Sequence, residues 1–228
     1  MHTALATNRT APAAAIVARS PHEASPTVAP SAPVTGSVRS YSKDEEIFAE
    51  GDRAAYLYKV VSGAVRTSKL LSDGRRQIDA FHLTGDIFGI EAGDEYRFCA
   101  EAVGDCTVVA YRRSSLDAFA AADAQLAHQF TAAMMRSLVR AQNHLLLLGR
   151  KTALEKIATF LLDMADRLSN GGAVDLPMSR IDIADHLGLT IETVSRSLTQ
   201  LEKQGVIELP AARRIVLSNK AALQRLNA

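Results

Sequence analysis

The stretch from Ser179 to Gln204 constrains the fold of this chain more than any other part of the sequence. Its apolar residues follow a helical spacing that breaks at Gly188, and glycine can leave a helix in a left-handed conformation without a steric penalty. Ser179, followed three residues later by Asp182, and then Thr190, stand where helix N-caps are expected. The sequence therefore predicts two short helices joined by a tight corner. The apolar positions are Ile183, Ala184, Leu187, Leu189, Val194 and Leu198.

The second of these helices places Glu192, Ser195 and Arg196 on adjacent rows of one face, because residues three and four apart are neighbours on a helix surface. Arginine pairs with guanine edges, glutamate accepts from the cytosine amino group, and serine accepts several partners. In an isolated helix, a simple ion pair between Glu192 and Arg196 would be the alternative. The complete two-helix frame favours a helix-turn-helix whose base-reading residues are Glu192, Ser195 and Arg196.

The run GLTIETVSRSLTQLEKQGVIEL resembles the recognition region of the Crp/Fnr superfamily of bacterial transcription regulators, and GRKTALEKIATFLL resembles its FixK branch. The resemblance implies that Glu192, Ser195 and Arg196 match an E-x-x-S-R pattern that reads a TTGAT half-site. Ile191 stands where the cyclic-AMP receptor branch has arginine, which disfavours a TGTGA half-site. Ser197 departs from the family pattern, in which this position is often aliphatic. The resemblance further implies recruitment of RNA polymerase, mainly for activation, and control of low-oxygen or nitrogen-fixation genes.

The DNA backbone contacts are expected from several polar residues around this unit. After Gly205, residues 206–209 and 214–217 alternate as a hairpin, which predicts a wing with Arg213 and Arg214 at its tip. The net charge of the whole chain is only +1, so the affinity for DNA must come from a local basic cluster near the C-terminal end. The expected backbone contacts are Ser179, Arg180, Thr190, Thr193, Arg213 and Arg214.

Residues 39–120 change to short apolar strands separated by glycine turns, among them the hairpin turn Ser72–Gly74. The strings EEIFAEGDRAAYLYKVVSGAV, DGRRQI and TGDIFG resemble the cyclic-nucleotide-binding domain. The expected fold is therefore α+β: a cyclic-nucleotide-binding-like β-roll sensor domain, a long dimerisation helix and a C-terminal winged helix-turn-helix.

The β-roll is expected to hold no cofactor. The segment Gly89–Phe98 is acidic and its Arg97 is followed by Phe98, whereas nucleotide-binding relatives have a small residue after that arginine; we therefore expect no cyclic AMP. The first 98 residues contain no cysteine, which excludes an N-terminal cysteine cluster for an Fe-S cluster. His82, His128 and His144 are available as haem ligands, but lone histidines are more often structural, and we expect no haem and no other metal. Cys99 and Cys106 are interpreted as packing thiols, with redox regulation as the alternative.

Residues 121–149 return to a helical period, with apolar residues at the alternating spacings of a coiled-coil seam. Such a helix needs a partner, and the resemblance implies a homodimer. The predicted seam residues are Leu126, Phe130, Met134, Leu138, Ala141, Leu145 and Leu148. Gly149–Lys151 is expected to interrupt the seam as a hinge, and Thr152 with Glu155 predicts a capping box for the next helix, within a DNA-binding domain at 150–228.

Residues 1–38 hold five of the seven prolines and are expected to form a disordered arm, with a transit peptide as the alternative. The sequence offers no apolar run of about 20 residues for a membrane helix, and its two cysteines suit a reducing compartment, so we expect a bacterial cytoplasmic protein. The alternative to an effector-free regulator is a receptor whose β-roll binds haem, a nucleotide or another small molecule before DNA. An enzyme is not expected, because no motif pairs a nucleophile with a base or builds a metal or phosphate site.

Overall fold

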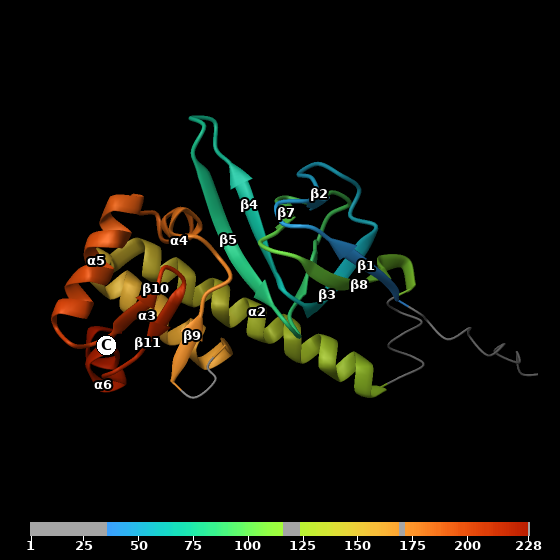
Figure 1. Cartoon of the computed structure of the whole chain (residues 1–228). Helices are drawn as coiled ribbons and strands as arrows, with labels where there is room; N and C mark the ends of the chain where they lie inside the picture. The colour runs from blue at the N-terminus through green and yellow to red at the C-terminus, as the bar shows by residue number, and fades with distance from the viewer. Residues whose placement is uncertain (1–35, 116–123, 169–171, 228) are drawn as a thin grey trace, which may run out of the picture. The chain divides into compact units, whose positions relative to one another are not determined.

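The computed structural model describes residues 36–115, 124–168 and 172–227. The predicted N-terminal arm lies almost entirely outside these residues. Two four-stranded antiparallel sheets build the β-roll, in the orders β1-β8-β3-β6 and β2-β7-β4-β5 (Figure 1). Their strands are β1 (Ser37–Tyr41), β2 (Glu46–Phe48), β3 (Tyr56–Ser62), β4 (Ala64–Leu70), β5 (Arg76–Leu83), β6 (Ile87–Phe88), β7 (Cys99–Ala102) and β8 (Cys106–Arg112). A short 3-10 helix, Arg113–Ser115, follows β8.

The core of the β-roll lies between the two sheets and is rich in aromatic rings. Phe48 stacks on Tyr96 at 3.6 Å between ring centroids and on Tyr58 at 5.6 Å. Phe88 stacks on Tyr58 at 5.2 Å and on His82 at 5.1 Å. Valine and alanine side chains of β3, β4, β7 and β8 fill the remaining space between the sheets. Rings therefore occupy the space between the sheets of the roll.

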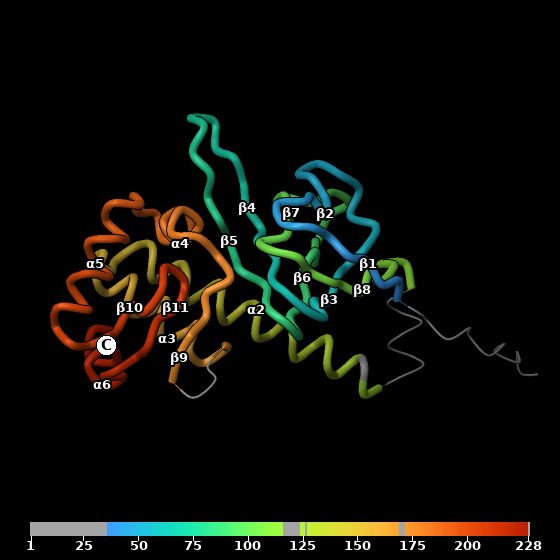
Figure 2. Tube along the Cα trace, viewed as in Figure 1, coloured from blue at the N-terminus to red at the C-terminus, as the bar shows by residue number. Residues whose placement is uncertain are grey.

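Strands β4 and β5 form a long hairpin that projects from the roll (Figures 1 and 2). Its turn lies where the Ser72–Gly74 pattern predicts it, and Gly74 has a φ of 84°, a left-handed conformation that glycine adopts without cost. The amide of Gly74 donates to the carbonyl of Leu71 at 2.9 Å. The hairpin prediction is therefore confirmed.

Helix α2 (Ala124–Arg150) follows the roll, and α3 (Ala153–Leu168) begins directly after it. The expected interruption at Gly149–Lys151 is found only at its last residue: α2 continues through Gly149 and ends at Arg150, and the break between the helices lies at Lys151–Thr152. A single exposed glycine at the end of a helix costs only about 1 kcal/mol relative to alanine and does not by itself end the helix. The predicted capping box is confirmed, because the Thr152 amide donates to Glu155 at 2.8 Å and the Glu155 amide donates to the Thr152 hydroxyl at 3.4 Å.

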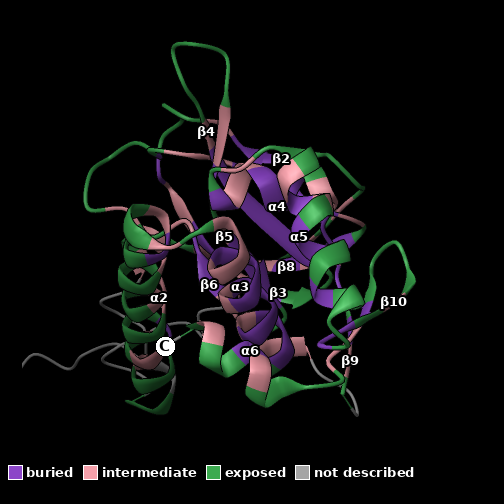
Figure 3. Cartoon of the chain, turned by 90° about the vertical axis from the view of Figure 1, so that its left-hand side faces the viewer, coloured by how far each residue is buried: buried purple, intermediate pink, exposed green. Residues whose placement is uncertain are grey.

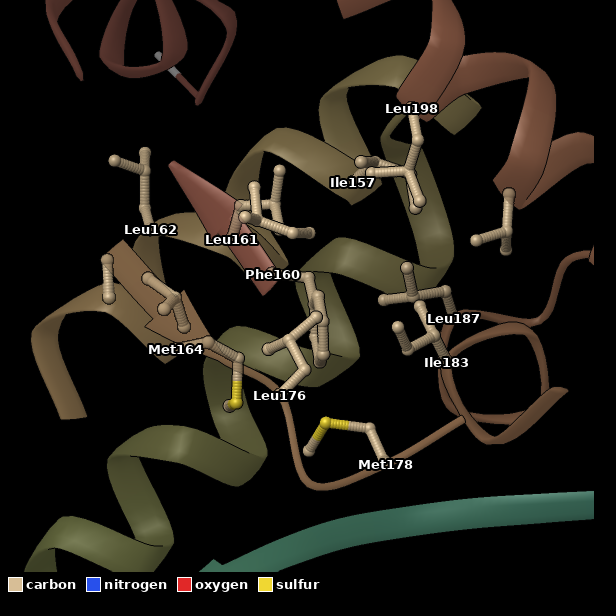
Figure 4. Packing of buried hydrophobic residues seen from close by; sticks show 14 of the residues in the cluster. Ile157, Phe160, Leu161, Leu162, Met164, Leu176, Met178, Ile183, Leu187 and Leu198 are labelled. Atoms are coloured by element: carbon tan, nitrogen blue, oxygen red, sulfur yellow. The ribbon is translucent and has the colours of Figure 1, made fainter. Parts of the chain in front are cut away.

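The C-terminal part contains β9 (Ala173–Asp175), α4 (Arg180–Leu187), α5 (Ile191–Lys203), β10 (Glu208–Ala211), β11 (Arg214–Val216) and α6 (Lys220–Asn227). The three strands form one sheet in the order β10-β11-β9. Helices α3, α4 and α5 enclose a buried core, in which Ile157, Leu161, Ile183, Leu187 and Leu198 point toward one another (Figure 4). Purple buried segments of α3, α4 and β5 contrast with the largely exposed α2 (Figure 3).

Three strands, β1, β6 and β7, were not predicted from the sequence. Strand β6 has only two residues, and β7 has the sequence CAEA, which has no strong β propensity; β1, SVRSY, overlaps the end of the predicted N-terminal arm. These strands are defined by pairing with β3, β4 and β8. These three strands therefore form because of their neighbours in the sheets and not because of their local sequence.

Candidate nucleic-acid interface

Helix α4 begins with a complete capping box. The Ser179 hydroxyl accepts from the Asp182 amide at 3.2 Å, and the Asp182 carboxylate accepts from the Ser179 amide at 3.0 Å and from the Ser179 hydroxyl at 2.7 Å. Burial would raise the pKa of Asp182, but these hydrogen bonds, with the guanidinium groups of Arg66 and Arg76, hold the pKa below its usual value. Ser179, expected at the DNA backbone, is thus engaged as the N-cap of α4.

The corner between α4 and α5 has the predicted chemistry. Gly188 has φ 60° and ψ 43°, and the Gly188 amide donates to the carbonyl of Ala184. Thr190 caps α5, because its hydroxyl accepts from the Thr193 amide at 3.2 Å. The side chains of Val194, Leu198 and Leu201 are buried and hold α5 on the core below. Ser197 is also buried, so the polar residue at this position is accommodated in the packed face.

The opposite face of α5 carries the predicted base readers. Glu192 and Arg196 are exposed, and Ser195 is half-buried. The backbone amide of Glu192, followed by the Thr190 hydroxyl, lowers the pKa of Glu192, so this side chain is an ionised acceptor at neutral pH. A shallow groove continues along the helix and is lined by Ser195, Arg196, Thr199, Gln200, Lys203 and Gln204. Gln200 and Gln204 were not singled out from the sequence, although they follow Arg196 at helical spacing.

Arg180 lies across the two helices. Its Nη1 donates to the Ser195 hydroxyl at 3.3 Å, which joins the first turn of α4 to the reading face of α5. Arg180 is half-buried, while Thr190 is exposed and Thr193 is half-buried at the N-terminus of α5. The structure thus brings the residues at positions 180, 190, 192, 193, 195 and 196 together at one end of the recognition helix.

The hairpin of β10 and β11 forms the wing, and both predicted arginines are exposed on it. The Arg213 guanidinium donates to the carbonyl of Pro177 at 2.9 Å, and Arg214 pairs with Asp175 at 3.5 Å. The carbonyl of Pro177 lies two residues before Ser179, so Arg213 connects the wing to the start of α4.

The predicted dimerisation residues divide into two groups. Met134, Leu138, Ala141 and Leu145 are exposed on α2, with 49% of Met134, 51% of Leu138 and 72% of Leu145 accessible. Phe130 packs against Tyr111 of the β-roll with ring centroids 5.6 Å apart, and Leu148 packs against the C-terminal core. The side chain of Leu126 lies outside the described residues. The exposed group has apolar neighbours in Met135, Val139 and Leu146, which are also exposed.

The segment that follows β6 differs from a phosphate site. Residues 89–98, all within the described part of the roll, form no helix, so they present no helix N-terminus to an anion. The Arg97 guanidinium instead binds the Glu91 carboxylate at 2.9 Å. The Glu and the Arg of this segment, which would contact a cyclic nucleotide in nucleotide-binding relatives, are therefore paired with each other.

Two of the candidate haem residues, His82 and His144, line one pocket, and neither candidate redox cysteine lines it. Cys99 is half-buried and its sulfur accepts from the Glu50 amide at 3.3 Å, while burial raises the pKa of Cys106, which makes its thiol a poor nucleophile. His82 is buried, and its Nε2 lies 3.1 Å from the Thr67 hydroxyl. His144 stacks on His186 of α4 at 4.1 Å between centroids, and His128 is exposed.

The described residues contain no group of three or more His, Cys, Asp or Glu side chains placed to hold a metal ion. Among the helices of these residues, none has the length and apolar character that a membrane span requires.

Two family models match this chain: the cyclic nucleotide-binding domain over residues 38–123 and the Crp-like helix-turn-helix domain over residues 155–226. The nitrogen fixation regulation protein FixK of Azorhizobium caulinodans is 53% identical over 197 residues, which cover 84% of this chain and 79% of that protein. FixK of Rhizobium meliloti is 44% identical over 197 residues, 86% of this chain and 90% of that protein. The solved structure of FixK2 from Bradyrhizobium japonicum is similar with a TM-score of 0.80 and 54% identity, covering 85% of this chain and 98% of that one.

Proposed function

Because this chain belongs to the FixK branch of the Crp/Fnr family of transcription regulators, we propose that it is a homodimeric, sequence-specific activator that binds DNA without a bound effector. The observation that carries the proposal is the reading face of α5, where Glu192 and Arg196 are exposed beside Ser195 on a capped helix. Its relatives are regulators by name and not enzymes, among them the transcriptional activatory protein AadR of Rhodopseudomonas palustris.

The DNA site is a TTGAT-N4-ATCAA-like palindrome. Arg196 supplies a fork of donors for a guanine edge, Glu192 accepts from an exocyclic amino group, and Ser195 contacts a neighbouring base. Arg180, Thr190 and Thr193 lie beside these readers and donate to phosphate oxygens, and Arg213 and Arg214 do so from the wing. A two-fold dimer matches two half-sites about one helical turn apart.

The dimer forms through the exposed apolar face of α2. Met134, Leu138, Ala141 and Leu145 recur at the spacing of a coiled-coil seam and remain exposed in one protomer. Burying such side chains against a second copy removes their apolar surface from water. This stabilises the dimer by roughly 25 cal/mol for each Å² of apolar surface buried. Phe130 and Leu148 stabilise the protomer, since they pack on the β-roll and on the C-terminal core.

The β-roll needs no bound small molecule for the protein to bind DNA. Its interior is filled by Phe48, Tyr58, Phe88 and Tyr96, and Arg97 is neutralised by Glu91. The Nε2 of buried His82 is engaged with the Thr67 hydroxyl, which gives this histidine a structural role in the roll. The input to the regulator is then its abundance or the oxidation of the half-buried Cys99. The names of the relatives support a role in nitrogen-fixation regulation. We propose that the protein acts at nitrogen-fixation or low-oxygen promoters by recruiting RNA polymerase.

Fluorescence anisotropy on purified protein in air tests this function. The protein is dialysed free of small molecules, its absorbance is checked for haem, and a TTGAT-N4-ATCAA duplex is compared with a TGTGA-type palindrome at one stated salt concentration. Tight binding to the first duplex only is expected. Failure on both, followed by rescue with haem, a nucleotide or a reductant, would show that the β-roll gates DNA binding.

A further inference from the structure

Two arginines of the β4–β5 hairpin reach the first helix of the reading unit. Arg76 Nη2 donates to Asp182 at 2.7 Å, and its Nε donates to Asp185 at 2.8 Å. Arg66 Nη1 donates to the same Asp182 oxygen at 3.4 Å. Both aspartates belong to α4, so strands far away in the sequence are joined to the helix that supports α5.

This contact is built into the fold and does not come from flexible surface side chains. Arg66 is 7% exposed and Asp182 is 5% exposed. On the side of the roll, Glu101 accepts from Arg66 Nε at 2.9 Å and Asp44 accepts from Arg66 Nη2 at 3.1 Å. A buried guanidinium that is held by several carboxylates has a fixed orientation, because breaking any one pair leaves a charge in a poorly solvated place.

The other end of α4 is attached to the same strand. Gln77 Nε2 donates to the carbonyl of His186 at 3.2 Å, and the His186 Nδ1 lies 3.1 Å from the carbonyl of Ile78. Strand β5 runs beside α4 in Figure 2, in agreement with these bonds. Helix α4 is therefore held at both ends, and α5 follows its orientation through the tight corner at Gly188.

We propose that Arg66 and Arg76 are positioning residues for DNA binding: they hold α4, and with it the reading helix, in the orientation that binds DNA, although neither touches DNA. The inference rests on the proposed function and explains how a β-roll without a ligand can hold the reading unit in place. Preorganisation of this kind raises affinity because the free protein does not have to select one orientation on binding.

The test compares Arg76→Met with Arg75→Met in the full-length protein. Both changes remove one positive charge from the same hairpin, but Arg75 is exposed and contacts Asp73 at the turn. Arg76→Met is expected to weaken binding to the TTGAT palindrome by about fivefold or more, while Arg75→Met stays close to wild type. The preference between the two duplexes and the salt dependence of binding should not change, because Arg76 contacts neither base nor phosphate.

Asp185→Asn completes a double-mutant cycle with Arg76→Met. If the two residues act through their mutual contact, Asp185→Asn weakens DNA binding in the wild-type background and has no further effect once Arg76 is replaced. Additive losses, unchanged affinity in Arg76→Met, or equal losses in both arginine variants would each overturn the proposal.

Amide hydrogen exchange without DNA separates this inference from the proposed function. In Arg76→Met, peptides that cover α4 should exchange faster than in wild type, while peptides of α3 are unchanged. Unchanged exchange in α4 would contradict the proposed positioning role of Arg76 whether or not the protein binds the chosen duplex. If wild type bound neither duplex, the DNA proposal would fail, and the exchange result would still decide whether Arg76 holds α4.

Discussion

At the scale of single residues, the reading face depends on which side chains α5 leaves free. Val194 and Leu198 are turned into the core, and positions 192, 195 and 196 lie on the opposite side of the helix. The Ser195 hydroxyl already accepts from Arg180, whereas the Arg196 side chain is exposed. Arg196 is consequently the residue from which we expect the largest share of base discrimination.

Replacing Arg196 by alanine should cost about 1 to 3 kcal/mol of binding free energy on the cognate palindrome and relax the preference at one base pair. Anisotropy titrations on cognate and single-substituted duplexes measure both effects. Arg213→Ala is the matched control, because a wing contact to phosphate should weaken all duplexes alike. Equal losses on cognate and scrambled DNA for Arg196→Ala would remove it from the base readers.

The two cysteines should differ in reactivity. Burial raises the pKa of the Cys106 thiol, so little of it is thiolate near neutral pH, while Cys99 is only half-buried. Limited alkylation with iodoacetamide, followed by peptide mass spectrometry, should label Cys99 well before Cys106. Faster labelling of Cys106 would mean that the β-roll opens in solution.

Local chemistry of this kind could be predicted from the sequence. The N-caps at Ser179, Thr152 and Thr190, the left-handed Gly188 and the exposed readers of α5 all follow from neighbours within four residues. The roles of Arg66 and Arg76 could not be predicted, because their partner Asp182 lies more than a hundred residues away. The sequence pattern predicted that Asp182 forms a capping box with Ser179. It did not predict that the other carboxylate oxygen of Asp182 accepts from Arg66 and Arg76.

At the scale of elements, the proposed dimer depends on which apolar residues α2 leaves exposed. A period of three and four residues predicted the helix, but period alone does not say which apolar residues face the protomer's own β-roll. The structure places Phe130 against Tyr111 and leaves Met134, Leu138 and Leu145 exposed. Gly149 similarly could not be assigned from sequence, since a glycine near a helix end is compatible with both a break and a continued turn.

Leu138→Lys places a charge in the middle of the exposed apolar face and should convert the dimer to a monomer in sedimentation velocity experiments, because an unpaired charge in an apolar interface is costly. Asn143→Lys introduces the same charge at an exposed position on a different face of α2 and should leave the dimer intact. A dimeric Leu138→Lys protein would place the interface elsewhere.

At the scale of the whole molecule, stability should fall on mild acidification because burial holds three histidines, His82, His144 and His186, in the neutral form. Burial lowers the pKa of His82 to about 4, and burial together with the neighbouring His144 lowers the pKa of His186 to about 3. Unfolded histidine titrates near pH 6.5, so between that pH and the lowered values the unfolded chain binds more protons than the folded one. The stabilisation is complete above about pH 6.5 and is lost as the pH falls, by up to about 1.4 kcal/mol per pH unit for each histidine.

Urea unfolding of the full chain between pH 7.5 and 5 measures how the free energy of unfolding changes with pH. His186→Gln should reduce the dependence of the unfolding free energy on pH by about one proton. If the wild-type free energy of unfolding were flat across this range, the folded state would not hold His82 and His186 in the neutral form.

The central claim is that two copies of α5, held by their own β-rolls, read one palindrome without an effector. Selection of bound duplexes from a random DNA library with ligand-free protein in air tests it most directly. The account predicts enrichment of TTGAT and ATCAA as an inverted repeat with a four-base-pair spacer, about one helical turn between half-site centres. Enrichment of a TGTGA-type repeat, of a single half-site or of no sequence would contradict it.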